Sequence, residues 1–224
     1  MAEKAYEKVI NYIKQGIVDG KYSMGEKLPP ERELAEQLEV SRNSVREGLK
    51  ILGIMGVISS QQGAGNYISD SFEKNLVETL SMMYALRKID YPQITEFRYA
   101  LEIQAFILAM DNISQKDINE MKSLIEKMES DISDAEKAQY DKKLHYTIIS
   151  ASKNWLIMKN LMALNEVIDI FIFHMRQAII SNERGGELLK DSHRQLVEAL
   201  DERNLNKGLH ALDNHFTYIR ENIN

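Results

Sequence analysis

The sequence predicts a mostly α-helical protein with one short β-hairpin near its N-terminus. Three observations support this prediction. Apolar residues recur at spacings of three and four along most of the chain, which is the period of an amphipathic helix. Closely spaced glycines and short strand-like runs occur together only in residues 53–68. Beyond residue 71 the only glycines are Gly185, Gly186 and Gly208, and the only proline is Pro92, so long helices can follow one another there.

The composition is that of an ordinary globular protein and excludes several kinds of site. Of the 224 residues, 44% are hydrophobic and 28% are charged. Because there is no cysteine, disulfides, thiolate metal sites and a cysteine nucleophile are excluded. The N-terminus lacks the pattern of a signal peptide, and charged residues interrupt the most apolar stretch, residues 167–180. We therefore expect a cytoplasmic protein that does not span a membrane.

The first helix is predicted from one apolar stripe near the N-terminus. Its members recur every three or four positions: Tyr6, Val9, Ile10, Ile13 and Ile17. A glycine-containing loop follows and ends at Pro29 and Pro30, where proline is tolerated because a new helix begins. That second helix is predicted from Glu31 to about Leu38.

A third helix follows after only three residues, Glu39, Val40 and Ser41. Ser41 is a good N-cap, and two short helices joined in this way have helix-turn-helix geometry. Next, residues 57–61 and 66–68 are predicted as the two strands of a small hairpin, or wing. A helix, a helix-turn-helix and a hairpin together predict a winged helix-turn-helix over residues 1–70.

Residues 71–224 are predicted to form an all-α bundle of six to seven helices. The boundary lies close to residues 69–72, where strand signals end. Successive amphipathic helices are predicted at 73–87, 92–110, 114–130, 134–151, 155–181, 186–202 and 205–222.

The start of the third helix carries side chains suited to DNA. Arg42 and Arg46 are one helical turn apart and share a face, and arginine is the side chain best suited to bidentate contact with guanine. Arg32, in the preceding helix, is placed to clamp a phosphate. Short polar groups surround them: Ser41, Asn43 and Ser44. An ordinary solvated helix face is the alternative interpretation, because helix-turn-helix signals are weak by themselves.

The charge distribution limits any nucleic-acid site to a small face. The net charge is −6, and residues 1–70 hold 9 Lys and Arg against 10 Asp and Glu. Phosphate binding depends on the local charge that is presented to the duplex. Between residues 41 and 62, Arg42, Arg46 and Lys50 are opposed only by Glu47. The sequence therefore predicts a focused basic face and not a broadly basic protein.

Three separated motifs resemble the N-terminal domain of the GntR family of transcription regulators. They are KLPPERELA at 27–35, VSRNSVRE at 40–47 and GAGNYI at 63–68, in the order that the family shows. Asn66 stands where the family often has threonine or serine, a mild departure that puts no role in doubt.

This resemblance implies DNA-binding roles for particular residues. In the family, the arginines equivalent to Arg32, Arg42 and Arg46 contact operator DNA. The family's wing glycine enters the minor groove, which implies the same for Gly63, with Gln62 beside it. The residues expected to contact DNA are therefore Arg32, Ser41, Arg42, Asn43, Ser44, Arg46, Gln62 and Gly63.

A second set of residues suggests a metal site in the bundle. Asp141 and His145 are spaced i and i+4, so they project from one helix face, while His193 and His215 lie on separate predicted helices. If one carboxylate and three imidazoles converge, they make a mixed nitrogen and oxygen site for zinc, nickel or a similar divalent ion. From spacing alone the signal is weak, because most histidines are structural or exposed.

Residues 71–224 also resemble the all-α FCD sensor domain of the FadR subfamily of GntR regulators. The features that carry the resemblance are Glu96-Phe97-Arg98, Leu101-Glu102, Asp141, His145, His193 with Arg194-Gln195-Leu196, and His215. In metal-binding members, one Asp and three His with this order and spacing hold the ion. The resemblance therefore implies a divalent metal, zinc or nickel, at Asp141, His145, His193 and His215.

Arg98 is the candidate for gripping an effector. Family members with small organic-acid ligands use an equivalent arginine to hold the carboxylate, which a guanidinium fits bidentately. The alternative is an ordinary i,i+4 ion pair with Glu102. Arg176 is a weaker second candidate.

Two histidines fall outside the predicted metal set. His174 is expected to be a bonded core group or to border the effector pocket. His210 is expected on the surface, because it lies about 140° around its helix from His215.

The sequence thus predicts a transcription regulator, expected to be a repressor and not an enzyme. A homodimer would bind a palindromic operator, and a small organic acid beside the metal would switch it. One alternative is a metal-dependent repressor that senses the metal itself. A metalloenzyme is a weaker alternative, because no obvious general base accompanies the metal residues.

Overall fold

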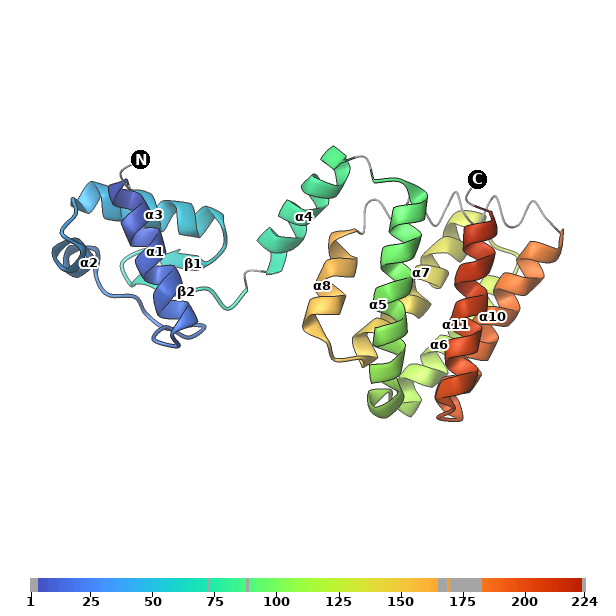
Figure 1. Cartoon of the computed structure of the whole chain (residues 1–224). Coiled ribbons are helices and arrows are strands. Elements are labelled where there is room, and N and C mark those ends of the chain that lie inside the picture. The colour runs from blue at the N-terminus through green and yellow to red at the C-terminus, as the bar shows by residue number, and fades with distance from the viewer. Residues whose placement is uncertain (1–3, 72, 88, 165–168, 170–182, 223–224) are drawn as a thin grey trace. The chain divides into compact units, whose positions relative to one another are not determined.

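The structure is a computed structural model, and it describes residues 4–71, 73–87, 89–164, 169 and 183–222. The chain divides into two compact units, Met1–Thr79 and Leu80–Asn224, here called the N-terminal unit and the helical unit (Figure 1). Within the described residues, no helix is long and apolar enough to cross a membrane.

The N-terminal unit has the predicted order of elements, so its winged helix-turn-helix architecture is confirmed. Its helices and strands are α1 (Ala5–Val18), α2 (Glu31–Leu38), α3 (Arg42–Ile54), β1 (Ile58–Gln61) and β2 (Gly65–Ile68). Pro30 is the N-cap of α2, and Glu39 ends this helix in the left-handed conformation at φ 53°. The Ser41 hydroxyl accepts a hydrogen bond from the amide of Ser44 at 3.1 Å, so it caps α3 as its sequence position predicts.

The hairpin is tied to the segment that leads into α2. Strands β1 and β2 pair antiparallel, with Ile58 opposite Ile68 and Gln61 opposite Gly65. On the other side of β2, the Leu28 amide donates to the Asn66 carbonyl at 2.8 Å. The base of the wing is therefore fixed to the chain just before the helix-turn-helix.

The core of this unit lies where α1, α3 and the hairpin meet. Its central side chains are buried: Val9, Ile13, Leu34, Val45, Leu49, Leu52, Ile58 and Ile68. Helices α1 and α3 approach so closely at Gly48 that a Cβ added there would lie 2.9 Å from the Cβ of Val9. The side of α3 that faces away from this core carries the candidate DNA residues.

The helical unit contains the predicted succession of helices. They are α4 (Glu73–Arg87), which begins in the N-terminal unit, then α5 (Tyr91–Asn112), α6 (Gln115–Glu129), α7 (Asp134–Ala151), α8 (Trp155–Ala163), α10 (Glu183–Asp201) and α11 (Leu205–Glu221). Of the helix predicted at 155–181, the structure confirms Trp155–Ala163 as α8, but this helix ends there with Leu164 as its C-cap, so the prediction of one continuous helix is wrong. Residues 165–168 and 170–181 lie outside the described part of the chain.

Polar side chains start several of these helices. Ser114 caps α6 and Ser133 caps α7, each in a capping box with the acidic residue three positions later. Asn154 and Asn204 cap α8 and α11 through their side-chain oxygens. These caps explain why the breaks between helices can be predicted from sequence.

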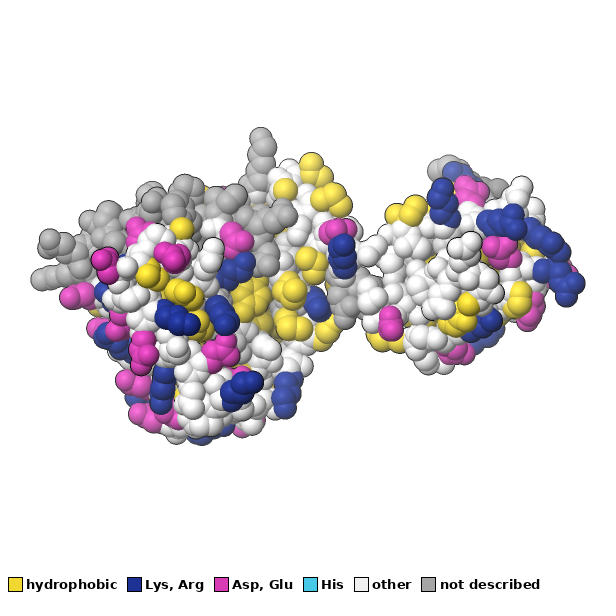
Figure 2. Space-filling model, turned by 180° about the vertical axis from the view of Figure 1, so that it is seen from behind, with side chains coloured by type: hydrophobic (Ala, Val, Ile, Leu, Met, Phe, Trp, Pro, Cys, Tyr) yellow, Lys and Arg dark blue, Asp and Glu magenta, His cyan; other side chains and the backbone are white. Residues whose placement is uncertain are grey.

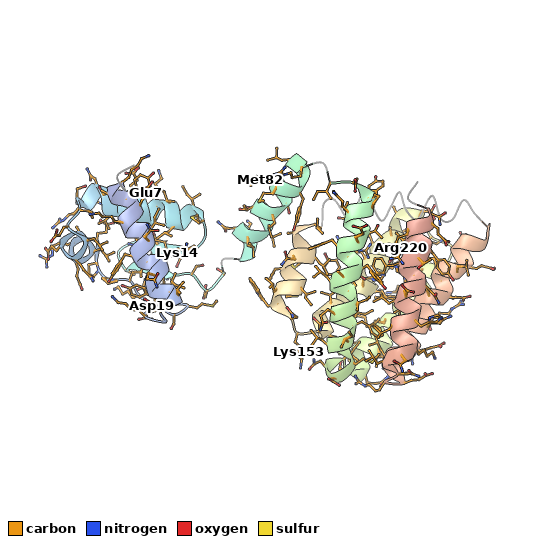
Figure 3. All side chains as sticks on the ribbon, in the orientation of Figure 1. Glu7, Lys14, Asp19, Met82, Lys153 and Arg220 are labelled. Atoms are coloured by element: carbon orange, nitrogen blue, oxygen red, sulfur yellow. The ribbon has the colours of Figure 1, made fainter. Side chains whose placement is uncertain are left out.

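Five of the helices close into a ring. Helix α5 packs on α7, α7 on α6, α6 on α10, α10 on α11, and α11 again on α5. Side chains fill the space between these helices (Figure 3), and Gly208 lets α11 approach the ring of Phe106. Any polar group that points inward from these helices is therefore buried in a common interior.

Candidate metal centre and nucleic-acid interface

The interior of the helical ring contains ionisable side chains among its apolar ones. All are at most 5% exposed: Arg98, Glu102, Asp141, His145, His193 and His215. Burying charged or polar groups is costly unless they are paired or bind an ion. The gathering of these ionisable side chains in one core therefore indicates a binding site for an ion or a ligand.

Three helices bring the four predicted metal residues together. Asp141 and His145 lie one turn apart on α7, His193 lies on α10 and His215 on α11. The three histidines each offer a ring nitrogen, and these nitrogens lie within 4.8 Å of one another. Oδ1 of Asp141 is 3.4 Å from Nε2 of His145 and 3.5 Å from Nε2 of His193. We call these four residues the Asp-His cluster.

Two histidines of the cluster are oriented by hydrogen bonds from their other ring nitrogen. Nδ1 of His145 lies 2.5 Å from Oε2 of Glu102, a carboxylate that can only accept. Nδ1 of His215 lies 3.1 Å from Oγ of Ser192, whose proton is donated to the Leu189 carbonyl at 2.7 Å. Both Nδ1 atoms are therefore donors, which leaves the Nε2 lone pairs as metal ligands. Metal-binding histidines in proteins are commonly fixed in this way.

The surroundings shift the pKa values within the site. Burial raises the pKa of Glu102, but the charges of Arg98 and His145 outweigh it and lower the pKa to about 2. Burial lowers the pKa of His145, but Glu102 and Asp141 outweigh it and raise the pKa to about 9. Burial and the neighbouring His193 and His145 hold the pKa of His215 well below its usual value. Glu102 is therefore ionised and His215 neutral, the forms that suit a cation site, whereas His145 has to release its Nε2 proton when a cation binds.

The four residues of the cluster fit a divalent metal ion. Nε2 of His145 is buried and makes no hydrogen bond, and an unsatisfied buried polar atom is costly. A metal ion would take the lone pair of this nitrogen. Three imidazoles and one carboxylate are a donor set for zinc, nickel or a related ion.

The candidate effector residue, Arg98, lies beside the cluster and is paired. Its Nε donates to Oε1 of Glu102 at 2.9 Å, so the ion pair that the i,i+4 spacing suggests is present. Its guanidinium also lies 5.6 Å from the centre of the Phe216 ring.

In the described part of the chain, two hollows are lined by Arg98 or its neighbours. A small cavity of about 10 Å³ is lined by Arg98, Glu102, Lys142, His145, Tyr146, Ile149 and Leu161. That is room for about one water molecule. A larger hollow of about 600 Å³ shares Lys142 and Tyr146 with it. As lined by the described residues, the cavity at Arg98 is therefore too small for an organic acid.

In the N-terminal unit, the predicted DNA residues lie at the surface. Arg32, Arg42, Asn43 and Arg46 are exposed at the start of α2 and of α3. Nε of Arg46 donates to Oε2 of Glu31 at 2.7 Å, so this arginine is held by an acidic neighbour. Figure 2 shows Lys and Arg side chains of this unit gathered at the end that carries α2. These arginines are thus exposed but have acidic neighbours on α2, since Nε of Arg32 also lies 3.8 Å from Oε1 of Glu36.

The wing residues line a groove next to the exposed arginines. A hollow of about 710 Å³ lies between the wing and the start of α2 and includes Gln62 and Gly63. Gly63 has a φ of 78°, which favours glycine at the tip of the hairpin. Lys27 also lines the groove and forms a β-bridge opposite Tyr67.

Sequence reasoning missed three residues of these sites. No sequence pattern distinguishes Ser192. Lys27 appears only as the first residue of the KLPPERELA motif, and Glu102 only in the FCD resemblance and as an i,i+4 partner of Arg98. Their roles depend on contacts between elements, which no local spacing reveals. His210 is exposed, as predicted. His174 and Arg176 lie outside the described residues.

Together these features define a class of protein: a winged helix-turn-helix followed by a helical unit whose core holds a cluster of ionisable side chains that could bind a metal ion. Comparison with known protein families then gives the family. Residues 5–68 match the bacterial regulatory proteins of the gntR family, and residues 93–218 match the FCD domain. The chain belongs to the GntR family of transcription regulators, in the group that carries an FCD domain.

Individual relatives agree with this assignment. The chain is 30% identical over 211 residues to the HTH-type transcriptional regulator LutR of Bacillus subtilis, covering 92% of this chain and 94% of LutR. It is 28% identical over 218 residues to an Escherichia coli protein named for regulation of the L-lactate dehydrogenase operon, covering 95% of this chain and 84% of that protein. The solved structure of Streptococcus agalactiae GntR shares the fold, with a TM-score of 0.59, 24% identity and coverage of 96% and 99% of the two chains.

Proposed function

We propose that this regulator is a repressor whose affinity for its operator is set by a small carboxylate bound beside a metal ion in the helical unit. The metal would be held by Asp141, His145, His193 and His215, with zinc or nickel as the ion. It would supply a Lewis-acidic position for one oxygen of the carboxylate.

The observation that carries this proposal is the buried convergence of the Asp-His cluster beside Arg98. Nε2 of His145 has no hydrogen bond. Glu102 contacts both Nδ1 of His145 and the guanidinium of Arg98, so the arginine lies close to the cluster. A metal and an arginine close together can hold both oxygens of a carboxylate. If the metal were itself the signal, an arginine beside the metal site would not be required.

Small hydroxy acids are the first compounds to test. One relative, which matches 95% of this chain, is named for regulation of the L-lactate dehydrogenase operon. L-Lactate, glucuronate and succinate represent the hydroxy acids, sugar acids and dicarboxylates that a metal and an arginine can accommodate.

DNA binding is assigned to the face formed by Arg32, Arg42 and Arg46, together with the wing. Short polar groups at the start of α3 complete that face: Ser41, Asn43 and Ser44. Gln62 and Gly63 at the tip of the wing would enter the minor groove. A homodimer would place two such faces on the half-sites of a palindromic operator. A protein that acts on chromosomal DNA in this way would work in the cytoplasm.

The DNA part of the proposal is tested by selection of duplexes from a random pool with the full chain. We expect a palindromic consensus with equal half-sites. A pool that stays random after repeated selection would contradict sequence-specific binding.

The effector part is tested by thermal shift of the zinc-loaded protein with the three acids. A ligand that binds the native state stabilises it, by about 2.7 kcal/mol when the ligand is at 100 times its Kd, and so raises the melting temperature. We expect at least one acid to do so for the wild type and not for Arg98→Met. If zinc alone changes operator affinity and no acid adds to it, the metal is the signal instead.

A further inference from the structure

We propose that Glu102 is a positioning residue of the metal site, which fixes His145 for metal binding while it holds Arg98. This inference rests on the metal site proposed above. It concerns a residue that is not among the metal ligands and that lies on a different helix, α5.

The geometry places one carboxylate between two donors. Oε1 of Glu102 accepts from Nε of Arg98 at 2.9 Å, and Oε2 lies 2.5 Å from Nδ1 of His145. The Glu102 and Arg98 side chains are 5% and 4% exposed and that of His145 is 3% exposed, so water cannot replace either contact. Each oxygen thus has its own partner.

The contact with His145 decides which of its nitrogens is available to a metal. A carboxylate accepts only, so Nδ1 keeps its proton and Nε2 presents a lone pair. Nε2 is the atom that lies 3.4 Å from Asp141, on the side of the cluster. Glu102 is therefore behind the ring, where it orients the ligand without touching the ion.

The need for two acceptors explains why a carboxylate stands here. A glutamine has the same shape but only one acceptor oxygen and a donor NH2 group. If its oxygen accepts from Arg98, its NH2 group faces Nδ1 of His145. The ring must then accept at Nδ1 and carry its proton on Nε2, where the metal would bind. If its oxygen instead accepts from Nδ1 of His145, its NH2 group faces the N–H donor of Arg98, and neither donor has an acceptor.

Removing Arg98 should therefore rescue the glutamine. In the double variant Arg98→Met, Glu102→Gln, the amide oxygen is released from competition and can accept from His145. In Arg98→Met, Glu102→Met, the shape is similar and neither position carries a charge, but no acceptor remains behind His145. These two double variants differ only in the acceptor behind His145, and neither leaves a buried cation unpaired.

The experiment measures the affinity of metal-stripped full-length protein for Co²⁺ by its visible absorption, with circular dichroism as the check of folding. We expect Glu102→Gln to weaken Co²⁺ binding about 10- to 100-fold, the usual cost of losing such a contact. We expect the Co²⁺ affinity of the double variant Arg98→Met, Glu102→Gln to be within about threefold of that of the single variant Arg98→Met. The double methionine variant should again be about 10- to 100-fold weaker.

A proton spectrum of the zinc-loaded protein supplies a second measurement. A short hydrogen bond from Nδ1 to a carboxylate should give a ring N–H resonance far downfield, which a purely structural role would not require. We expect this resonance in the wild type and in Arg98→Met, but not in Arg98→Met, Glu102→Met.

Equal Co²⁺ affinities for the two double variants would overturn the inference, because Glu102 would then serve only as the counter-ion of Arg98. That outcome differs from failure of the proposed metal site. If the site itself were wrong, the wild type would bind no Co²⁺ at all.

Discussion

The two units carry their candidate functional residues in opposite ways. In the N-terminal unit these residues are exposed and follow one another closely, as Arg42 and Arg46 do on the first turns of α3. In the helical unit they are buried and come from helices far apart in the sequence, as His145 and His215 do. An exposed residue can be changed with little effect on the stability of the fold, whereas each buried candidate residue also belongs to the hydrophobic core. Substitutions in the two units should therefore have different consequences.

The largest expected effect is that of His193→Ala, which removes a buried member of the cluster. We expect the variant to lose stoichiometric zinc, measured by elemental analysis. Zinc at 100 times its Kd stabilises a native protein by about 2.7 kcal/mol, which is about 5–10 °C for a domain of this size. The wild type should show this gain and His193→Ala should not.

Metal-stripped wild type is the control for that experiment, because it separates loss of zinc from loss of packing. A variant that retained one zinc ion per chain would show that His193 is not a ligand.

The next effect is that of Arg42→Ala and Arg46→Ala on operator binding. Each arginine is expected to contribute about 1–3 kcal/mol, or roughly 5- to 150-fold in Kd. Since both side chains are exposed, the free energy of unfolding should change by less than about 0.5 kcal/mol. Fluorescence anisotropy with a selected duplex measures the first quantity and urea unfolding the second. Lys14→Ala, an exposed change on α1, is the matched control.

Ser192→Ala should weaken zinc binding by about tenfold, because His215 loses the acceptor that orients it. Ser152→Ala is a close control. Ser152 is also buried, and its hydroxyl also donates to the carbonyl three residues earlier, but it contacts no histidine of the cluster. We expect similar losses of stability in the two variants and loss of zinc affinity only in the first. Equal zinc affinities in a chelator competition would rule out the orienting role.

The smallest expected effect is that of Glu31→Gln. Glu31 holds Arg46 at 2.7 Å in a partly exposed pair, and such pairs are worth about 0.2–1 kcal/mol. Releasing the arginine should strengthen operator binding up to about fivefold. Glu33→Gln removes the same charge from the same helix without freeing Arg46. An equal gain in both variants would mean that net charge, and not this pair, sets the affinity.

Much of the N-terminal unit could be predicted from sequence because its determinants are local. Ser41 caps α3 through the amide three residues ahead, and Pro30 stands directly before α2. In the same way, the capping boxes at Ser114 and Ser133 mark the starts of two helices in the helical unit. Local hydrogen bonds of this kind leave a signature in consecutive residues.

The buried site could be predicted only in part. The spacing of Asp141 and His145 gives a shared face, but only family resemblance suggested that His193 and His215 meet them. The contacts of Glu102 with His145 and of Ser192 with His215 join different helices, 43 and 23 residues apart. Such contacts depend on how the five helices close into a ring, and periodicity does not specify that arrangement.

In the proposed function, a site buried in the helical unit controls DNA binding by the N-terminal unit. The most direct test is the Kd of the zinc-loaded protein for its selected duplex, with and without L-lactate, glucuronate or succinate. Allosteric coupling of ordinary size predicts a change of about 5- to 150-fold with one of these acids in the wild type, and none in His193→Ala. A Kd that no acid changes, or that changes equally in His193→Ala, would contradict the account.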